Sequence, residues 1–315
     1  MQYRSIIRIL GLLIGIFSIT MLPPAFVAYG YKDGAGVPFI LSFLLCIFIG
    51  FVIWYPNRRF KADLKVRDGF LIVVLFWTVL GAVGAIPFML ASNPHLSLAS
   101  AMFEAFSGLT TTGATVLTGI EHLPKAILYY RQQLQWLGGM GIIVLAVAIL
   151  PMLGVGGMQL YRAETPGPVK DSKMTPRIAD TAKHLWYIYL ALTIACALAF
   201  YLAGMGWFDA ICHAFSTVAI GGFSTYDASM GYFQSPLINA VCVIFLLLSS
   251  INFPLHFAAI RGKSVGTYVR DPEFRAFLFI QVTLVLFCFA VVLYNHVFGS
   301  TTSSFKHGAF QAGSI

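Results

Sequence analysis

Long uncharged stretches alternate with short charged segments along the whole chain. No Asp, Glu, Lys or Arg occurs in residues 9–31, 34–57, 69–103, 132–161, 184–208, 228–260 and 276–305. A helix needs about 20 consecutive apolar residues to cross the hydrocarbon core of a bilayer. The pattern therefore predicts seven membrane-spanning helices, at 9–30, 36–56, 69–91, 127–152, 184–204, 236–260 and 275–298.

The composition supports a polytopic membrane protein. Of the 315 residues, 58% are hydrophobic and only 10% are charged, whereas a soluble domain carries about 25% charged residues. This excludes a soluble cytosolic enzyme, a disordered protein and a disulfide-rich secreted module. The five cysteines lie singly in apolar stretches without metal-ligand spacing, so we expect them to pack as small apolar side chains.

The positive charges indicate how the chain crosses the membrane. All but four of the 20 Lys and Arg residues fall in the N-terminal segment or in the loops after the second, fourth and sixth predicted helices. The exceptions are Lys32, Lys125, Arg131 and Lys306. Because cytoplasmic loops carry an excess of Lys and Arg, we expect the N-terminus and the basic loops in the cytoplasm. The net charge of +8 then reflects topology beside membrane lipid, and we expect no nucleic-acid partner.

Two further apolar stretches, 105–120 and 210–226, are too short to cross the membrane. Both must enter and leave on the extracellular side, because the flanking basic loops are cytoplasmic. The sequences SAMFEAFSGLTTTGAT and DAICHAFSTVAIGGFST align on Phe106 and Phe215, and a glycine, Gly113 or Gly222, follows seven residues later. A third copy begins at SFKHGAFQAGSI, with Phe310 in the same place. The chain therefore contains an internal repeat.

The start of each copy resembles the start of a helix. Ser100, Asp209 and Ser304 stand six residues before the three aligned phenylalanines, and all are residue types favoured as N-caps. A helix of about 11 residues is roughly 16 Å long, so it reaches only to mid-membrane. We call these predicted elements half-helices. The repeating unit is then helix, half-helix, extended glycine-containing segment, helix.

This unit predicts an all-α polytopic membrane protein of repeated helix–pore-loop–helix units with re-entrant half-helices. Its expected divisions are two leading transmembrane helices at 1–66, a first repeat at 67–160, a cytoplasmic basic loop at 161–183, a second repeat at 184–262 and an incomplete third repeat at 263–315.

The extended segments carry the candidate chemistry. The first filter segment comprises Thr110, Thr111, Thr112 and Gly113, and the second comprises Ala219, Ile220, Gly221 and Gly222. Their backbone carbonyls can replace the hydration shell of a cation, as in a potassium selectivity filter, at the partially negative end of each half-helix. Glu121 and Asp227 follow on the outer side and are expected to concentrate cations there. The alternative is a loop packed against helices, and the second copy in register favours the filter.

The stretches FSGLTTTGA, QWLGGMGI and FSTVAIGGFST resemble those of the Trk/Ktr/HKT potassium-transporter superfamily, most closely the membrane subunit of the bacterial Trk system. The resemblance implies K⁺ uptake across the inner membrane, a homodimer, and gating by a cytosolic nucleotide-binding ring of the TrkA type. It also implies four repeats around one pore, and no organic cofactor or enzymatic activity. The implied potassium ligands are the backbone groups of Thr111, Thr112, Gly113, Ile220, Gly221 and Gly222.

The chain departs from that pattern at its end. Ile315 corresponds to Thr111 in the repeat register, so the third filter glycine and the whole fourth repeat are absent from the sequence. We therefore interpret the chain as an N-terminal portion of a longer protein.

Some residues outside the filter segments carry weaker expectations. Glu104 and His213 share one position in the repeat, and ionisable groups inside a membrane protein are functional candidates. We expect both to support the filter, although the sequence identifies no partner for either. The small residues Gly138, Gly139 and Gly141 predict close helix packing. Asn252 and Pro254 predict a kink in the sixth helix.

Other functions remain open. Broken helices also occur in secondary solute transporters, although the repeats of many of those are inverted, whereas the repeats predicted here share one orientation. An intramembrane enzyme would need a nucleophile with a base, or a metal motif such as HExxH, and the predicted spans contain neither. A further alternative is a non-conducting fragment.

Overall fold

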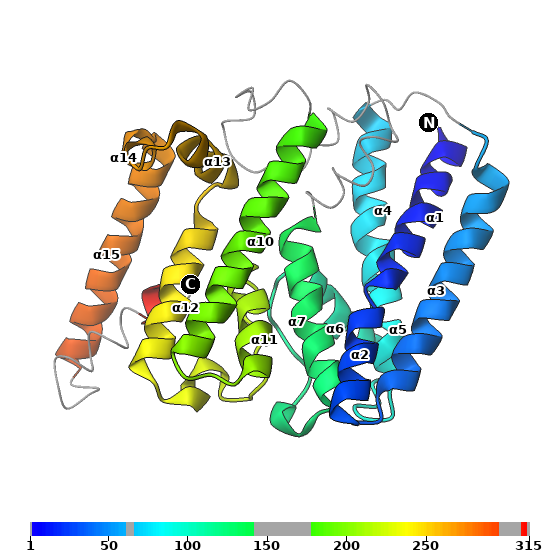
Figure 1. Cartoon of the computed structure of the whole chain (residues 1–315), viewed down its shortest axis with the longest axis horizontal. Helices are drawn as coiled ribbons and strands as arrows, with labels where there is room; N and C mark the ends of the chain where they lie inside the picture. Colours follow the sequence, from blue (N-terminus) through cyan, green and yellow to red (C-terminus); the bar gives the residue numbers. More distant parts are fainter. Residues whose placement is uncertain (1, 61–65, 142–177, 296–309, 314–315) are drawn as a thin grey trace.

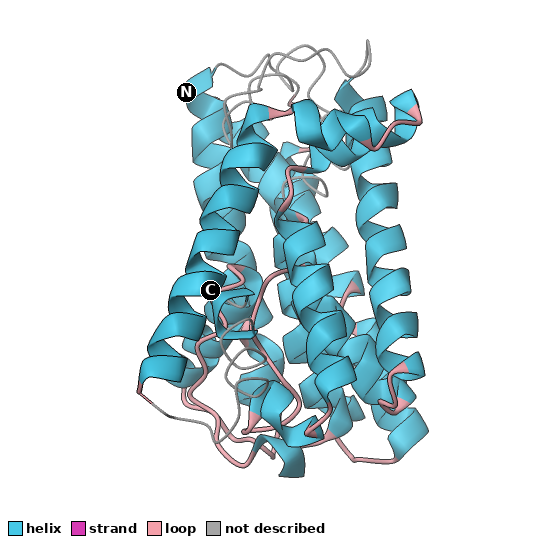
Figure 2. Ribbon diagram, turned by 90° about the vertical axis from the view of Figure 1, so that its left-hand side faces the viewer, coloured by secondary structure: helices cyan, strands magenta, loops and turns pink. Residues whose placement is uncertain are grey.

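The computed structural model describes residues 2–60, 66–141, 178–295 and 310–313, and every regular element in these ranges is helical (Figures 1 and 2). The elements are α1 (Tyr3–Ile19), α2 (Leu22–Tyr31), α3 (Gly36–Asn57), α4 (Val66–Gly84), α5 (Ile86–Leu90), α6 (Leu98–Leu109), η1 (Ile120–His122), α7 (Lys125–Gly139), α10 (Ile178–Leu202), α11 (Trp207–Val218), η3 (Ser229–Phe233), α12 (Pro236–Ser250), α13 (Phe253–Gly262), α14 (Gly266–Arg270) and α15 (Pro272–Tyr294). The predicted all-α class is confirmed.

Most of the predicted spans have counterparts. Five segments of the described chain are long and apolar enough to cross a membrane: Tyr3–Tyr31, Gly36–Asn57, Asp68–Leu90, Lys183–Leu202 and Pro272–Tyr294. The predicted helix at 127–152 begins as α7, and its second half lies outside the described residues.

The predicted span at 236–260 forms as two helical segments. It is a pair, α12 and α13, bent by 89°. Ile251, which ends α12, has an extended backbone, and the next helix starts with Pro254 in its first turn. Proline cannot donate the hydrogen bond that would continue α12. The kink expected at Asn252 and Pro254 is therefore confirmed.

Both short helices of the repeat form. α6 and α11 have 12 residues each, which corresponds to about 18 Å, so neither can cross a bilayer of about 30 Å.

The N-caps of these helices differ from the prediction. α6 is capped by Ser97, whose hydroxyl accepts from the N–H of Ser100 at 3.2 Å, and α11 begins after Gly206. Ser100 and Asp209 therefore lie inside the first turn, three residues after the actual caps. Ser304 lies outside the described residues.

α7 stands between two groups of helices (Figure 1). One apolar core joins α1–α7, and a second joins α10–α13 with Phe310. Leu134 of α7 is buried in the first core, whereas Trp136 and Met140 pack into the second. α15 lies at one edge, and none of its residues is buried.

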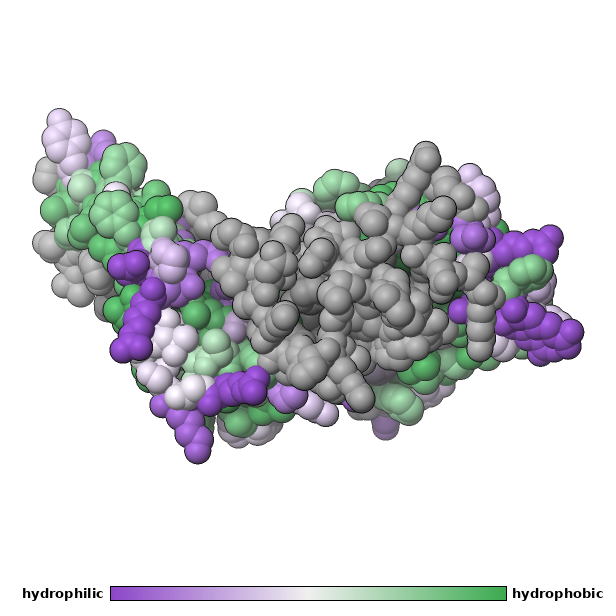
Figure 3. Space-filling view, turned by 90° about the horizontal axis from the view of Figure 1, so that it is seen from above, coloured by the Kyte–Doolittle hydropathy of each residue, from purple (hydrophilic) through white to green (hydrophobic). Residues whose placement is uncertain are grey.

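Basic side chains gather at one end of the molecule. Figure 3 looks onto this end and shows hydrophilic side chains over the end of α3 and over α13 and α14. The exposed residues there include Arg58, Arg59, Arg261, Lys263 and Arg270. Lys32 and Lys125 lie at the opposite end, in the turn after α2 and at the start of α7 (Figure 1).

Candidate functional site

The first filter segment leaves α6 through a tight hydrogen-bonded turn. The N–H of Thr111 donates to the carbonyl of Gly108 at 3.0 Å, and the N–H of Thr112 donates to the carbonyl of Ser107 at 2.9 Å. These two bonds define a Schellman motif, which satisfies carbonyls that the end of a helix would leave unpaired.

The second filter segment leaves α11 in the same way. The N–H of Ile220 donates to the carbonyl of Thr217 at 3.1 Å, and the N–H of Gly221 donates to that of Ser216 at 2.8 Å. The repeat seen in the sequence is therefore also a repeat of backbone hydrogen bonds.

The backbone angles repeat as well. The φ angles are 55° at Thr111 and 76° at Gly113, and they are 54° at Ile220 and 84° at Gly222. Glycine adopts this left-handed region without strain, whereas a β-branched residue rarely does. The left-handed conformation costs about 1–2 kcal/mol for a residue with a side chain. Such strain persists only where the surroundings hold it, and it concentrates at functional sites.

The two filter segments touch each other. A Cβ atom on Gly113 would overlap the carbonyl oxygen of Gly221, and one on Gly222 would lie 3.8 Å from the Cα of Gly113. Glycine at 113 therefore satisfies two demands, a positive φ and a close approach. Thr110, Thr112, Ile220 and Gly222 are exposed, so the joined segments line an open face of the described chain.

α7 packs against the ends of both half-helices through glycines. A Cβ on Gly138 would overlap the carbonyl oxygen of Leu109, the last residue of α6. A Cβ on Gly139 would lie 3.0 Å from the Cα of Ala219, where α11 ends. The predicted close packing is confirmed. From the same helix, Gln135 Nε2 donates a hydrogen bond of 2.6 Å to the carbonyl of Gly221.

A buried ion pair supports the first filter segment from behind. Arg131 Nε on α7 lies 2.7 Å from Glu104 Oε1 on α6, and the two side chains are 1% and 0% exposed. Glu104 also accepts from the hydroxyl of Thr115 at 2.9 Å and the N–H of Val116 at 3.2 Å. Arg131 further donates to the carbonyl of Ser224 at 3.1 Å, so it bridges the two repeats.

Sequence reasoning missed the role of Arg131, which it only counted among the basic residues on the outer side. A usable signal was present, because Arg131 falls inside the predicted helix at 127–152. An arginine within a membrane span normally has a buried partner.

The second repeat carries a counterpart of this arrangement, with His213 at the position of Glu104. Nδ1 of His213 lies 2.8 Å from the carbonyl of Asp209, and its Nε2 lies 3.0 Å from the hydroxyl of Ser224. His213 and Ser224 are eleven residues apart, as are Glu104 and Thr115. A side chain of the half-helix thus holds the segment after the filter in both repeats.

The outer acidic residues join the two repeats. The carboxylate of Asp227 accepts from the N–H groups of Gly119 at 2.7 Å and Ile120 at 3.2 Å. Glu121 accepts from the N–H of Asp227 at 3.2 Å. These carboxylates hold the outer loops of the two repeats together. Their expected role in concentrating cations stays a prediction. Nearby, burial and the carboxylate of Asp209 raise the pKa of the Tyr226 hydroxyl.

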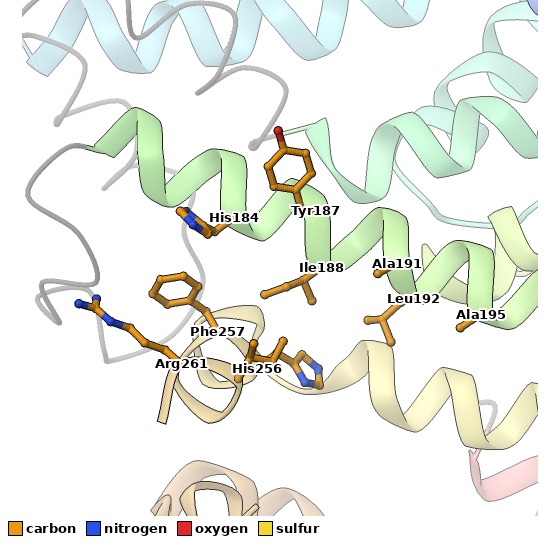
Figure 4. Close-up of a pocket in the computed structure, with 10 residues that line it drawn as sticks. His184, Tyr187, Ile188, Ala191, Leu192, Ala195, His256, Phe257 and Arg261 are labelled. Carbon is orange, nitrogen blue, oxygen red and sulfur yellow. The ribbon is translucent and has the colours of Figure 1, made fainter. Parts of the chain in front are cut away.

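A cavity of about 870 Å³ lies away from the filter segments, between α10 and α13 (Figure 4). Its wall is mostly apolar, with His184, His256 and Arg261 as its strongly polar residues. Nδ1 of His256 lies 2.8 Å from the hydroxyl of Tyr268, and Nε2 lies 2.9 Å from the carbonyl of Leu248. The contact with Leu248 ties α13 to the end of α12 across the bend between them.

Comparison with known proteins decides the family. The TrkH family, described as cation transport proteins, matches residues 36–314. The chain belongs to the TrkH family. The Trk system potassium uptake protein TrkH of Vibrio parahaemolyticus is 66% identical over 317 residues, which cover 100% of this chain and 65% of that protein. The Escherichia coli K12 protein of the same name is 59% identical over 315 residues, with the same coverage.

A solved TrkH structure has the same fold. The crystal structure of the potassium transporter TrkH from Vibrio parahaemolyticus matches with a TM-score of 0.88 and 61% identity, covering 100% of this chain and 64% of that one. The resemblance to the potassium-transporter superfamily is confirmed. This TrkH-family chain spans about two thirds of the length of these relatives.

Proposed function

We propose that this chain supplies two of the filter segments of a potassium-conducting pore, and that its function is K⁺ uptake. The observation that carries the proposal is the matched pair of filter segments, which share one backbone conformation and contact each other at Gly113 and Gly221. The printed names of the relatives, potassium uptake proteins, support the same ion.

The proposed chemistry uses backbone groups. A cation that enters the filter gives up water, and carbonyl oxygens replace its hydration shell. The left-handed residues at Thr111 and Ile220 each follow a right-handed or nearly right-handed residue at the end of a half-helix. We propose that this backbone conformation presents carbonyl oxygens of the filter segments to the ion. The half-helices end at the same place, so their partially negative termini add to the attraction.

The polar side chains around the first filter segment add no net charge to it. Arg131 and Glu104 neutralise each other, so neither repels nor traps a passing K⁺. Thr110 donates its hydroxyl to the carbonyl of Phe106 at 2.7 Å and lies 2.8 Å from the hydroxyl of Thr112. We propose that the threonine hydroxyls stiffen the first filter segment and that backbone oxygens bind the ion.

The finer features of the system belong to this proposal. The basic end, with Arg58 and Arg261, faces the cytoplasm by the positive-inside rule. The N-terminus then lies on the cytoplasmic side of a bacterial inner membrane. The functional protein is a homodimer without enzymatic activity, and a cytosolic nucleotide-binding ring of the TrkA type gates it. The dimer, the lack of enzymatic activity and the ring subunit rest on the family resemblance.

The test is rubidium uptake into proteoliposomes. The protein to use is a chimera that joins residues 1–315 to the part of the Vibrio parahaemolyticus relative that this chain does not cover, called the TrkH chimera below. We expect Rb⁺ and K⁺ to enter in preference to Na⁺, and Gly113→Ser to weaken that preference. Failure of the chimera to carry Rb⁺, with a nucleotide-loaded ring subunit present, would overturn the proposed function. The alternative of a secondary solute transporter would then have to be considered again.

A further inference from the structure

The side chain of Gln135 makes three hydrogen bonds to the second repeat. Its Nε2 donates to the carbonyl of Gly221 at 2.6 Å, and its Oε1 accepts from the hydroxyl of Ser216 at 2.7 Å and from the N–H of Phe223 at 3.1 Å. An amide offers two donors and two acceptor positions. Gln135 is fully buried, so water cannot replace the bonds that a substitution would remove.

Hydrogen bonds fix the two peptide groups on either side of the Gly221 Cα. The N–H of Gly221 is held by the carbonyl of Ser216 at 2.8 Å, and its carbonyl is held by Gln135. The peptide after Gly221 leads directly into Gly222, whose φ is 84°. Glycine rotates freely in an unrestrained chain. A filter built from two consecutive glycines therefore needs an external group to hold it.

The two repeats solve this problem differently. Gly221 corresponds to Thr112 in the first filter segment, where the Thr112 hydroxyl lies against that of Thr110. A Cβ on Gly221 would overlap the amide of Gln135. The Gln135 side chain thus occupies the space of the side chain that the second segment lacks.

We propose that Gln135 is a positioning residue of the second filter segment and that it sets the preference of this segment for potassium. It acts by holding the carbonyl of Gly221 and the backbone at Phe223 at fixed positions, so that the segment cannot collapse around a smaller cation such as Na⁺. This inference rests on the proposed function of the filter segments.

Two other glutamines on α7 provide matched controls. Gln132 is fully buried and its amide has no hydrogen-bond partner among the described residues. Gln133 donates to the carbonyl of Thr20, away from the filter, at 2.9 Å. Replacing either removes a buried amide from the same helix without touching Gly221.

The experiment compares Gln135→Leu and Gln135→Glu with Gln132→Leu in the TrkH chimera, measuring ⁸⁶Rb⁺ uptake in competition with Na⁺. The glutamate keeps acceptors for Ser216 and Phe223 but removes the donor to Gly221. Loss of one such hydrogen bond corresponds to a change of roughly three- to tenfold. We expect both Gln135 variants to lose Rb⁺-over-Na⁺ discrimination by about that factor, and Gln132→Leu to keep it.

A second readout separates this inference from the proposed function. The thermal unfolding temperature of each purified variant is measured in K⁺ and in Na⁺, which reports ion binding without transport. We expect a K⁺-specific increase in the chimera that shrinks in both Gln135 variants and persists in Gln132→Leu. An undiminished K⁺ increase and unchanged ion discrimination in the Gln135 variants would overturn the role of Gln135. A chimera that shows the K⁺ increase but no uptake would overturn only the proposed function.

Discussion

The Glu104–Arg131 pair shows how two charged side chains are accommodated inside the protein behind the filter segments. Removing two charges from water is costly, and a buried pair repays that cost only when further hydrogen bonds satisfy both groups. Here the carboxylate of Glu104 also accepts from the hydroxyl of Thr115 and the N–H of Val116. The guanidinium of Arg131 also donates to the carbonyl of Ser224 and the hydroxyl of Thr115. The pair therefore links the segments after both filters without leaving net charge behind them.

A double-mutant cycle tests this interpretation. We expect Glu104→Gln and Arg131→Met each to lower the free energy of unfolding of the TrkH chimera by about 3–5 kcal/mol, because each leaves one buried charge unpaired. The double variant removes both charges, so its loss is expected to be smaller than the sum of the single losses by about 0.5–3 kcal/mol. The measurement is unfolding in mixed micelles, and strictly additive losses would show that the two groups do not depend on each other.

At this scale the sequence revealed the position of the site but not its partners. Glu104 and His213 were identifiable as equivalent ionisable residues because the repeat aligns them. Their contacts, with Arg131 and Ser224, depend on how α7 and the returning loops pack. Side-chain contacts between residues far apart in sequence cannot be derived from spacing alone.

Among the helices, α7 joins the two repeats. It contacts the ends of both half-helices at Gly138 and Gly139, and it supplies Arg131 and Gln135. Small residues allow helices in membranes to approach closely. Any shift of α7 along its axis would therefore move both filter segments together.

Substitution of one glycine tests the importance of this approach. Gly138→Ala places a methyl group against the carbonyl oxygen of Leu109, and overpacking of this kind costs about 1–3 kcal/mol. Gly15 in α1 is the control, because nothing lies within 4 Å of a Cβ built there. We expect Gly138→Ala to lower the thermal unfolding temperature of the chimera and reduce Rb⁺ uptake, and Gly15→Ala to lower neither. Equal behaviour of the two variants would contradict the assigned role of Gly138.

Helix positions were predictable where composition alone decides them. The long spans follow from the need for about 20 apolar residues, and the half-helices follow from apolar runs that are too short. The first cap was predicted three residues too late because Ser97 and Ser100 are both residue types that cap helices. In the structure α6 starts after Ser97, whose hydroxyl accepts from the N–H of Ser100. The sharp bend between α12 and α13 exceeds the kink that Asn252 and Pro254 suggest.

Across the whole molecule, three features support the proposed ion conduction. The filter segments of two repeats meet at Gly113 and Gly221 on an open face. Basic side chains gather at one end, and apolar helices surround the half-helices. The chain spans about two thirds of the length of its relatives, so conduction is measured in the TrkH chimera, which restores that length.

The most direct test of the central claim is the anomalous X-ray signal of Rb⁺ bound to the TrkH chimera. We expect a peak beside the backbone oxygens of the two filter segments, within Thr111–Gly113 and Ile220–Gly222. The peak should weaken in Gly113→Ser, because a side chain there collides with the carbonyl of Gly221. Rb⁺ bound elsewhere in the protein, with no peak at the filter segments, would contradict the account.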